Sequence, residues 1–422
     1  MNADLSLFPR TAGVDATGGL SIGGVPATEL ARRFGTPLFV YDEEHLRATC
    51  REAVQAFGTD NVIYATKAFL CVAMARLAHE EGLLLDVATG GELHVALHAG
   101  VPGDRCVMHG NNKSDDEIVA AMRAGVRHIV VDSFDEFDRI ERLVASGERA
   151  PRVQVRVTPG VHVDTHDYVA TGQDDSKFGF NLNNGDAHRA IERARSSSAV
   201  HLVGIHCHIG SNVVEAANFE DAWGVMVGMF EPLGLPEITV GGGLGVAYTT
   251  GESAPTMAEW GSVLRRATAT LPAGTKVYVE PGRSIVARAG VTLYTVGTVK
   301  DIDGIRRYVS VDGGMSDNPR PMMYGSRYEV FDAGRMDAPR DSTARLVGKH
   351  CESGDILILD AAVNHGVAVG DILVMPVTGA YGHSMASNYN KVPRPAVVFV
   401  SGGEPRVVVR RETPEDLVRL DQ

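Results

Sequence analysis

The feature that most constrains the fold is a regular alternation of short β-branched runs with longer segments of helical spacing, which begins near residue 61. Segments such as Ala68–Glu81 and Asp115–Ala124 carry good helix formers at helical spacing. Eight β-then-α units are typical of a TIM (β/α)8 barrel, an α/β fold. An open doubly wound sheet is the alternative, although it usually has fewer strands and a glycine loop after the first. The expected strands are Asn61–Thr66, Leu83–Thr89, Arg105–His109, His128–Ser133, Arg152–Thr158, Leu202–His208, Glu237–Val240 and Lys276–Glu280.

The pattern changes after Arg283, where strand-like runs follow one another across turns such as Asp303-Gly304, with little helical periodicity between them. These runs are Val291–Val299, Arg307–Val311, Asp355–Leu359, Asp371–Met375, Ala396–Val400 and Arg406–Arg410. We therefore predict a barrel domain over residues 37–285 and a β-rich domain of barrel or sandwich type over residues 286–422. We expect the N-terminal segment, residues 1–36, to contribute to this β domain.

Charge and composition exclude several classes of partner. The formal net charge is -13 and the chain has no Lys/Arg run, which argues against nucleic acid or an anionic membrane surface as a partner. No stretch of eighteen uncharged apolar residues occurs, and Met1–Arg10 has no basic flank before an apolar segment, so we expect a cytoplasmic protein. Five cysteines without a CxxC pair indicate neither a disulfide framework nor a zinc knuckle.

In a TIM barrel, chemistry lies at the carboxyl ends of the strands. Lys67 follows the first predicted strand at such an end. A lysine in this partly desolvated place can lose its proton and attack an aldehyde, which is Schiff-base chemistry. Taken alone, a lysine is most often a solvated surface charge.

The last two predicted strands end in residues suited to a phosphate. Gly241-Gly242-Gly243 follows the seventh strand, where TIM barrels commonly bind phosphate because glycine lets backbone N–H groups approach the oxygens. Gly282 and Arg283 follow the eighth strand beside Glu280. An anion such as Glu280 against a pyridine nitrogen keeps that nitrogen protonated and the ring an effective electron sink. Together with Lys67, these residues predict pyridoxal phosphate.

His206 and His208 are two residues apart, so on a strand they face the same side. Such a pair is compatible with zinc, but a tetrahedral site needs further ligands and Cys207 between them points the opposite way. An imidazole that stacks on the cofactor ring also explains His208. We therefore predict no metal.

Many separate segments of the chain resemble the fold-type III pyridoxal phosphate-dependent decarboxylases, most closely the branch that acts on meso-2,6-diaminopimelate, and the resemblance covers nearly the whole chain. The matching segments are Tyr64–Ala68, Asp86–Leu93, His109–Ser114, Thr171–Gly179, His206–Ser211, Gly241–Gly245, Glu280–Arg283, Asp317–Pro321, Cys351–Asp355 and Gly379–Tyr381. The sequence departs from the family pattern at Phe69 and Asn212, where asparagine and glutamine are frequent.

The resemblance implies a role for each matching position. Lys67 would hold the cofactor as a Schiff base, His208 would stack on its ring, Glu280 would pair with its nitrogen and Asp86 would lie near the lysine. Ser211, Gly241, Gly242, Gly243, Gly282, Arg283 and Tyr381 would surround the cofactor, mainly at its phosphate. The substrate contacts would be Arg283, Arg320, Tyr324, Glu352 and Tyr381. Cys351, donated across a homodimer interface, would reprotonate a carbanion that is delocalised into the cofactor.

The expected function is decarboxylation of meso-2,6-diaminopimelate to L-lysine. A guanidinium such as Arg320 suits the distal carboxylate, and Glu352 suits the distal ammonium. A decarboxylase of ornithine, arginine or D-lysine is an alternative, although its substrate would leave Arg320 unpaired. An amino-acid racemase would need a second base opposite Lys67. A non-catalytic relative would not need both Lys67 and Cys351.

Overall fold

The computed structural model describes residues 4–160 and 174–422, so Thr171, Gly172 and Gln173 of one matching segment lie outside the described residues. The chain forms two compact units. The barrel unit comprises Thr49–Val246 and Ala254–Ser284, and the β unit comprises Met1–Ala48, Ala247–Ser253 and Ile285–Gln422. These units differ from the predicted domains at residues 37–48 and 247–253, which belong to the β unit.

The barrel unit is a ring of eight parallel strands in the order β5, β6, β7, β8, β9, β11, β12, β13. Val62 pairs with Val279 in parallel and joins the two ends of the ring. The strands are β5 (Ile63–Ala65), β6 (Leu84–Val87), β7 (Cys106–Met108), β8 (His128–Val131), β9 (Arg152–Thr158), β11 (His201–His206), β12 (Glu237–Thr239) and β13 (Lys276–Tyr278). Each overlaps one predicted run, so the TIM barrel is confirmed and the open sheet is wrong. A short strand, β10 (Phe180–Asn181), pairs with β9.

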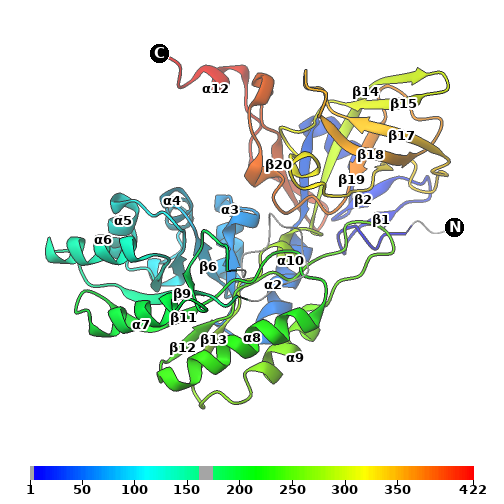
Figure 1. Cartoon of the computed structure of the whole chain (residues 1–422). Helices are drawn as coiled ribbons and strands as arrows, with labels where there is room; N and C mark the ends of the chain where they lie inside the picture. Colours follow the sequence, from blue (N-terminus) through cyan, green and yellow to red (C-terminus); the bar gives the residue numbers. More distant parts are fainter. Residues whose placement is uncertain (1–3, 161–173) are drawn as a thin grey trace. The chain divides into compact units, whose positions relative to one another are not determined.

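Helices surround the strands of this unit (Figure 1). They are α3 (Val72–Glu80), α4 (Gly90–His98), α5 (Asp115–Ala124), α6 (Phe134–Ala145), α7 (Asp186–Ser196), α8 (Ala216–Phe230) and α9 (Met257–Ala267). Their ends follow local sequence signals: Ser114 and Glu117 form a capping box that begins α5. Of the helices in the described residues, none is long and apolar enough to cross a membrane.

The β unit is built on a second sheet, in which strands follow the order β18, β17, β15, β14, β4, β20, β21, while β19 pairs with β14 and β16. The strands are β4 (Leu38–Asp42), β14 (Gly290–Ile302), β15 (Arg306–Val311), β16 (Phe331–Asp332), β17 (Ser342–Val347), β18 (Ile356–Val363), β19 (Ile372–Met375), β20 (Ala396–Ser401) and β21 (Glu404–Val409). All six predicted runs are present in this sheet.

Residues 38–42 were assigned to the predicted barrel domain without a predicted strand, but they form β4, which pairs with β14 and β20. All five of its residues are buried, as expected for a strand in the middle of a sheet. The N-terminal segment forms a small sheet of its own from β1 (Gly13–Val14), β2 (Leu20–Ile22) and β3 (Val25–Pro26). Backbone hydrogen bonds tie it to the β unit, because Leu20 donates to the Ala333 carbonyl over 2.8 Å.

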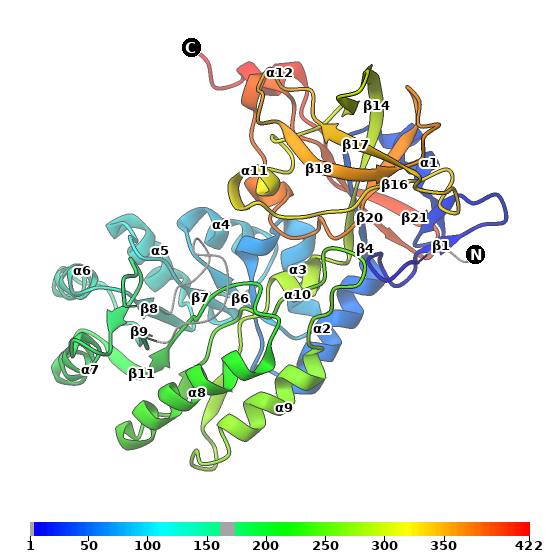
Figure 2. The same cartoon turned by 45° about the vertical axis from the view of Figure 1, so that its right-hand side comes forward.

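Five further helices of the described residues complete the fold. α1 (Ala27–Phe34) follows β3, α2 (Glu43–Phe57) precedes the first barrel strand, and α10 (Arg283–Val286) follows the last. In the β unit, α11 (Arg320–Tyr324) lies against β18, as Figure 2 shows, and α12 (Pro414–Val418) is near the C-terminus.

Candidate active site

Two histidines flank Glu280, which follows β13 at the carboxyl end of the barrel strands. His206 Nε2 lies 3.0 Å from Glu280 Oε2, and His109 Nε2 lies 3.1 Å from Glu280 Oε1. All three side chains are buried. Burial alone would raise the pKa of the Glu280 carboxyl, but the two imidazoles hold it well below its usual range. Glu280 is therefore an anion held at both oxygens.

Asp86, in β6, extends this cluster. Its Oδ1 lies 3.8 Å from His109 Nε2. Burial raises the pKa of Asp86, and the negative charge of Glu280 adds to the rise. Burial opposes a charge on His109, but Asp86 and Glu280 raise its pKa, whereas burial lowers the pKa of His206 to about 4. The cluster thus favours a cationic His109 and a neutral His206 around the Glu280 carboxylate.

The predicted pair of His206 and His208 does not form a ligand pair. Among the described residues, His206 instead joins His109 and Glu280 in the one buried group whose potential metal-ligand atoms all lie within 4.8 Å of one another. In this arrangement the imidazole nitrogens are at hydrogen-bond distance from the carboxylate oxygens. His206 is thus hydrogen-bonded to Glu280, and His109 forms a close ion pair with the other carboxylate oxygen.

Lys67 lies on a 3-10 turn, Thr66–Ala68, that directly follows β5. Thr66 Oγ1 donates to the Asp86 carbonyl over 2.6 Å and so ties this turn to β6. The charge of Lys67 acts on both Asp86 and His208. The expected partly desolvated environment is wrong, because the Lys67 side chain is exposed while its neighbours Thr66 and Ala68 are buried.

The glycine loop after β12 approaches other backbone closely. Gly241 has φ 75° and Gly243 has φ 115°, in the left-handed region that favours glycine. A Cβ on Gly241 would collide with the Cys207 carbonyl oxygen, and a Cβ on Gly242 with the Glu280 carbonyl oxygen. The loop therefore requires glycine at these positions, because a side chain there would meet the neighbouring backbone.

His208 is held by this loop. The Gly242 N–H donates to His208 Nδ1 over 3.3 Å, which places the proton of the neutral ring on Nε2. Burial, followed by the charge of Lys67, holds the pKa of His208 well below its usual range. A neutral, fixed imidazole of this kind can stack on an aromatic ring.

Arg283 and Ser211 meet beside the same loop. Arg283 begins α10, is buried, and donates from Nη2 to Ser211 Oγ over 2.8 Å. Gly282 packs closely on the end of β5, since a Cβ there would lie 2.9 Å from the Ala65 Cβ. The residues predicted from the ends of strands β5, β11, β12 and β13 are thus brought to one end of the barrel.

Sequence reasoning missed Arg156. This buried residue of β9 has its guanidinium 3.5 Å from Asp132 and over the Phe178 ring at 4.4 Å. Its charge also acts on His208, whose pKa it lowers after burial and Lys67. The signal was present: Gln154 and Arg156 alternate with valines in β9, and such polar residues at a spacing of two face the barrel interior.

The remaining predicted residues, Arg320, Tyr324, Cys351, Glu352 and Tyr381, all lie in the β unit. Arg320 is buried at the start of α11, where it donates to the Tyr328 hydroxyl. Tyr324, at the end of α11, and Tyr381, which has φ 61°, are half-buried. The structure pairs Arg320 with Tyr328, which the sequence analysis did not single out.

Cys351 is exposed, whereas the other four cysteines are buried. Its backbone N–H donates to Asn390 Oδ1 over 2.9 Å. The preceding His350 anchors the loop, because its Nδ1 lies 2.8 Å from Asp355 Oδ2 and its ring stacks on Tyr389. Glu352 is exposed beside Cys351. Backbone and neighbouring side chains therefore hold this loop, while the thiol projects to its surface.

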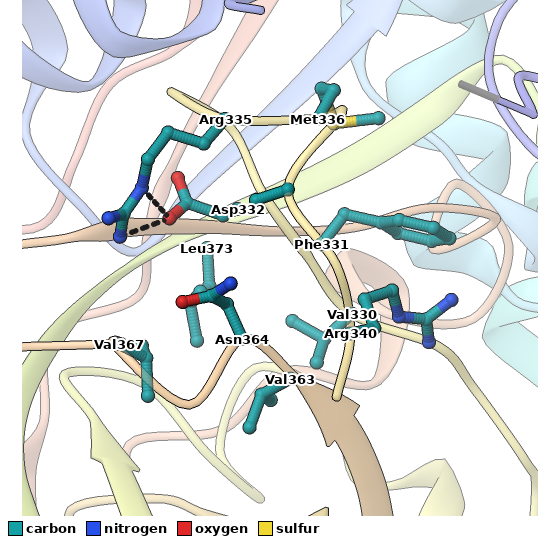
Figure 3. Close-up of a pocket in the computed structure, with 11 residues that line it drawn as sticks. Val330, Phe331, Asp332, Arg335, Met336, Arg340, Val363, Asn364, Val367 and Leu373 are labelled. Carbon is teal, nitrogen blue, oxygen red and sulfur yellow. Dashed lines mark hydrogen bonds and ion pairs between the residues drawn. The ribbon is translucent and has the colours of Figure 1, made fainter. Parts of the chain in front are cut away.

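Two cavities in the β unit differ in what they can hold. The one in Figure 3, beside the Arg335–Asp332 ion pair, has a volume of about 20 Å³, which fits a single water. A groove of about 730 Å³ is lined by residues that include Tyr328, Met322 and Leu359. The first is too small for an amino acid.

Comparison with known proteins places the chain in a family. Residues 43–287 match the family described as pyridoxal-dependent decarboxylase, pyridoxal binding domain. The chain is 44% identical over 436 residues to the diaminopimelate decarboxylase of Mycobacterium tuberculosis, covering 99% of this chain and 98% of that protein. The Bacillus subtilis diaminopimelate decarboxylase is 45% identical over 426 residues, covering 96% and 95%. The chain belongs to the diaminopimelate decarboxylase family.

Solved structures of the diaminopimelate decarboxylase family have the same fold. The M. jannaschii diaminopimelate decarboxylase matches with a TM-score of 0.91 at 32% identity, over 98% of both chains. The cofactor of this pyridoxal-dependent family is pyridoxal phosphate. The barrel residues fit that group: the anionic Glu280, the side-chain-free glycine loop and the amine of Lys67 offer a partner for a ring nitrogen, a phosphate and an aldehyde.

Proposed function

We propose that the protein decarboxylates meso-2,6-diaminopimelate to L-lysine and carbon dioxide, as the last step of lysine biosynthesis. Its relatives from M. tuberculosis and B. subtilis bear the name of this activity. The observation in the structure that carries the proposal is the buried guanidinium of Arg320. Ornithine, arginine and D-lysine have no distal carboxylate to pair with it. The lysine/ornithine decarboxylase of Vibrio vulnificus is only 22% identical to this chain. At that identity the comparison shows a shared fold and does not bear on the substrate.

The barrel residues position the cofactor in this proposal. Pyridoxal phosphate, when bound, draws electrons from the substrate carbon that loses its carboxylate. Lys67 Nζ would hold the cofactor, and Asp86 lies within the electrostatic reach of Lys67. The Glu280 anion would keep the ring nitrogen protonated, and His208 would cover the ring. The phosphate end would be held by Ser211, Gly241, Gly242, Gly243, Gly282, Arg283 and Tyr381.

The β-unit residues select the substrate and return the proton. Arg320 and Tyr324 bind the distal carboxylate, since a guanidinium offers a planar fork for two oxygens. Glu352 binds the distal ammonium, and Arg283 and Tyr381 complete the substrate contacts. The Cys351 thiol donates its proton from Sγ to the carbon that has lost carbon dioxide.

We further propose a cytoplasmic homodimer in which Cys351 acts in the active site of the partner subunit. Exposure of the Cys351 side chain supports this proposal, because a donor that acts in another subunit must project from its own. Apolar side chains at the groove of the β unit also support it: Leu359 is 58% and Met322 is 49% exposed.

Carbon dioxide release from meso-diaminopimelate, lysine, ornithine and arginine tests the activity. We expect release from meso-diaminopimelate and at least a roughly hundredfold lower kcat/KM for the others, because they leave Arg320 unpaired. A preference for ornithine or arginine would refute the substrate. Absence of release from all four, with the cofactor bound, would indicate a non-catalytic relative.

A further inference from the structure

Arg320 is enclosed by two tyrosines of the β unit. Its guanidinium carbon lies 4.8 Å from the centre of the Tyr248 ring and 5.7 Å from that of Tyr328. The two rings pack edge to face with centres 5.4 Å apart. Arg320 Nη1 also donates to the Tyr328 hydroxyl. All three side chains are buried, with Arg320 only 6% exposed. We call these three residues the arginine cage.

The cage lacks a negative charge. Among the described residues, no carboxylate forms an ion pair with Arg320, whereas the buried Arg156 lies 3.5 Å from Asp132. A buried cation without a counter-ion is costly, and aromatic faces offset only part of that cost. The cage therefore has an unmet demand for an anion, which a carboxylate of the substrate would satisfy.

Tyr248 and Tyr328 come from segments that are distant in the sequence, and the Glu329 carboxylate connects these segments. Tyr248 lies in Ala247–Ser253, a segment that interrupts the barrel unit and belongs to the β unit. Glu329, next to Tyr328, accepts from the Thr250 N–H over 2.6 Å and pairs with Arg340 at 2.7 Å. Glu252 accepts from the Tyr248 N–H over 2.9 Å and fixes the turn. The backbone beside each tyrosine is thus held by contacts that do not involve Arg320.

We propose that Tyr248 and Tyr328 are positioning residues that orient Arg320 toward the distal carboxylate and so determine specificity for a substrate with two amino-acid ends. This inference rests on the proposed function of Arg320. An arginine side chain has many rotamers, and fixing it in advance reduces the entropy lost when the carboxylate binds. The rings fix the plane of the guanidinium, and the Tyr328 hydroxyl fixes its rotation.

Steady-state kinetics of the holoenzyme test the cage. Tyr328→Phe keeps the ring and removes a hydrogen bond to a charged group, so KM for meso-diaminopimelate should rise roughly 10-fold. Tyr248→Leu removes a cation–π face and should raise KM by about 2- to 30-fold, whereas Tyr248→Phe, which keeps the ring but loses the hydroxyl that interacts with Arg320, should restore part of it. In each variant kcat and cofactor affinity should change less than about twofold, because only binding of the distal end is affected.

The matched control is Tyr308→Leu, a half-buried tyrosine of β15 in the same unit, for which KM should be unchanged. A purely structural role for the cage would lower Tm and kcat without a selective change in KM, and that result would overturn the proposal. Arg320→Ala separates the proposed role of the two tyrosines from the proposed role of Arg320 itself. If it raises KM while the tyrosine variants do not, the cage is wrong and the role of Arg320 stands. If it leaves KM unchanged, the proposed role of Arg320 fails, and the cage fails with it.

Discussion

The barrel unit and the β unit hold their functional residues in different ways. Around Glu280, the barrel side chains are buried at strand ends and bond directly to one another. In the β unit, Cys351 and Glu352 are exposed on a loop that is fixed through its backbone and through His350. Arg320 is the exception, since it is buried between aromatic rings. The barrel side chains are thus fixed by one another, whereas most of the β-unit residues proposed to contact the substrate are fixed through their backbone.

The comparison predicts that the largest loss of activity comes from the barrel. Lys67→Ala should lower kcat/KM by roughly a thousandfold or more, since no other described group takes the place of its amine. Lys276→Ala is the matched control, because Lys276 is an exposed lysine at the start of β13. We would measure carbon dioxide release for both. Substantial turnover by Lys67→Ala would mean that the cofactor is held elsewhere.

A smaller loss is expected from the β unit. Cys351→Ser should lower kcat by about a hundredfold with little change in KM, the order expected for loss of a proton donor. Because the other four cysteines are buried, an alkylating reagent should modify Cys351 first, and activity should fall at the rate of labelling. Full labelling of Cys351 in an active enzyme would rule out its proposed role.

The two units should also respond to pH in opposite directions. Burial raises the pKa of Asp317, in the β unit, to about 7. Its stabilising contribution is therefore complete below the unfolded pKa, near 4, and is lost as the pH rises through about 7. Burial lowers the pKa of His206, in the barrel, to about 4, so its contribution is complete above about 6.5 and is lost as the pH falls through 4.

The smallest expected effect is the pH-dependent change in stability caused by Asp317, which thermal unfolding of Asp317→Asn measures. The amide carries no charge and can still accept from the Tyr294 hydroxyl, but it loses the acceptor for the Gly314 N–H, a pH-independent cost. We expect the Tm of the variant, relative to that of the unchanged protein, to be about 2–4 °C higher at pH 8 than at pH 4. Asp360→Asn, at an exposed position, should show no such difference. An equal effect at both pH values would exclude titration of Asp317 as the cause.

Much of the barrel could be predicted from the sequence because its signals are local. Each strand carries its own β-branched run, and Lys67, Gly241 and Glu280 directly follow such runs. Contacts between side chains that are distant in the sequence could not be predicted from such local signals. Glu280 meets His206 from 74 residues away, and Tyr248, in a segment that interrupts the barrel unit along the chain, meets Arg320 within the β unit. Periodicity shows which face a residue takes, but it does not show which residue lies opposite.

Strand β4 and Lys67 also show that the sequence does not reveal which residues an element will contact. The sequence Leu38–Asp42 is equally suited to a barrel strand, and only its partners β14 and β20 assign it to the β unit. Lys67 follows its strand as predicted, but the turn after β5 leaves its side chain exposed. A position along the chain therefore predicts an element, whereas burial depends on how the following turn is placed.

Borohydride reduction of the holoenzyme, followed by peptide mapping, tests the central claim most directly. Reduction makes the bond between a lysine amine and the cofactor aldehyde permanent, so the labelled peptide identifies the lysine. We predict one labelled site, Lys67, with loss of the cofactor absorption band and of activity. Labelling of another lysine, such as the buried Lys113 that pairs with Glu136, would contradict the account.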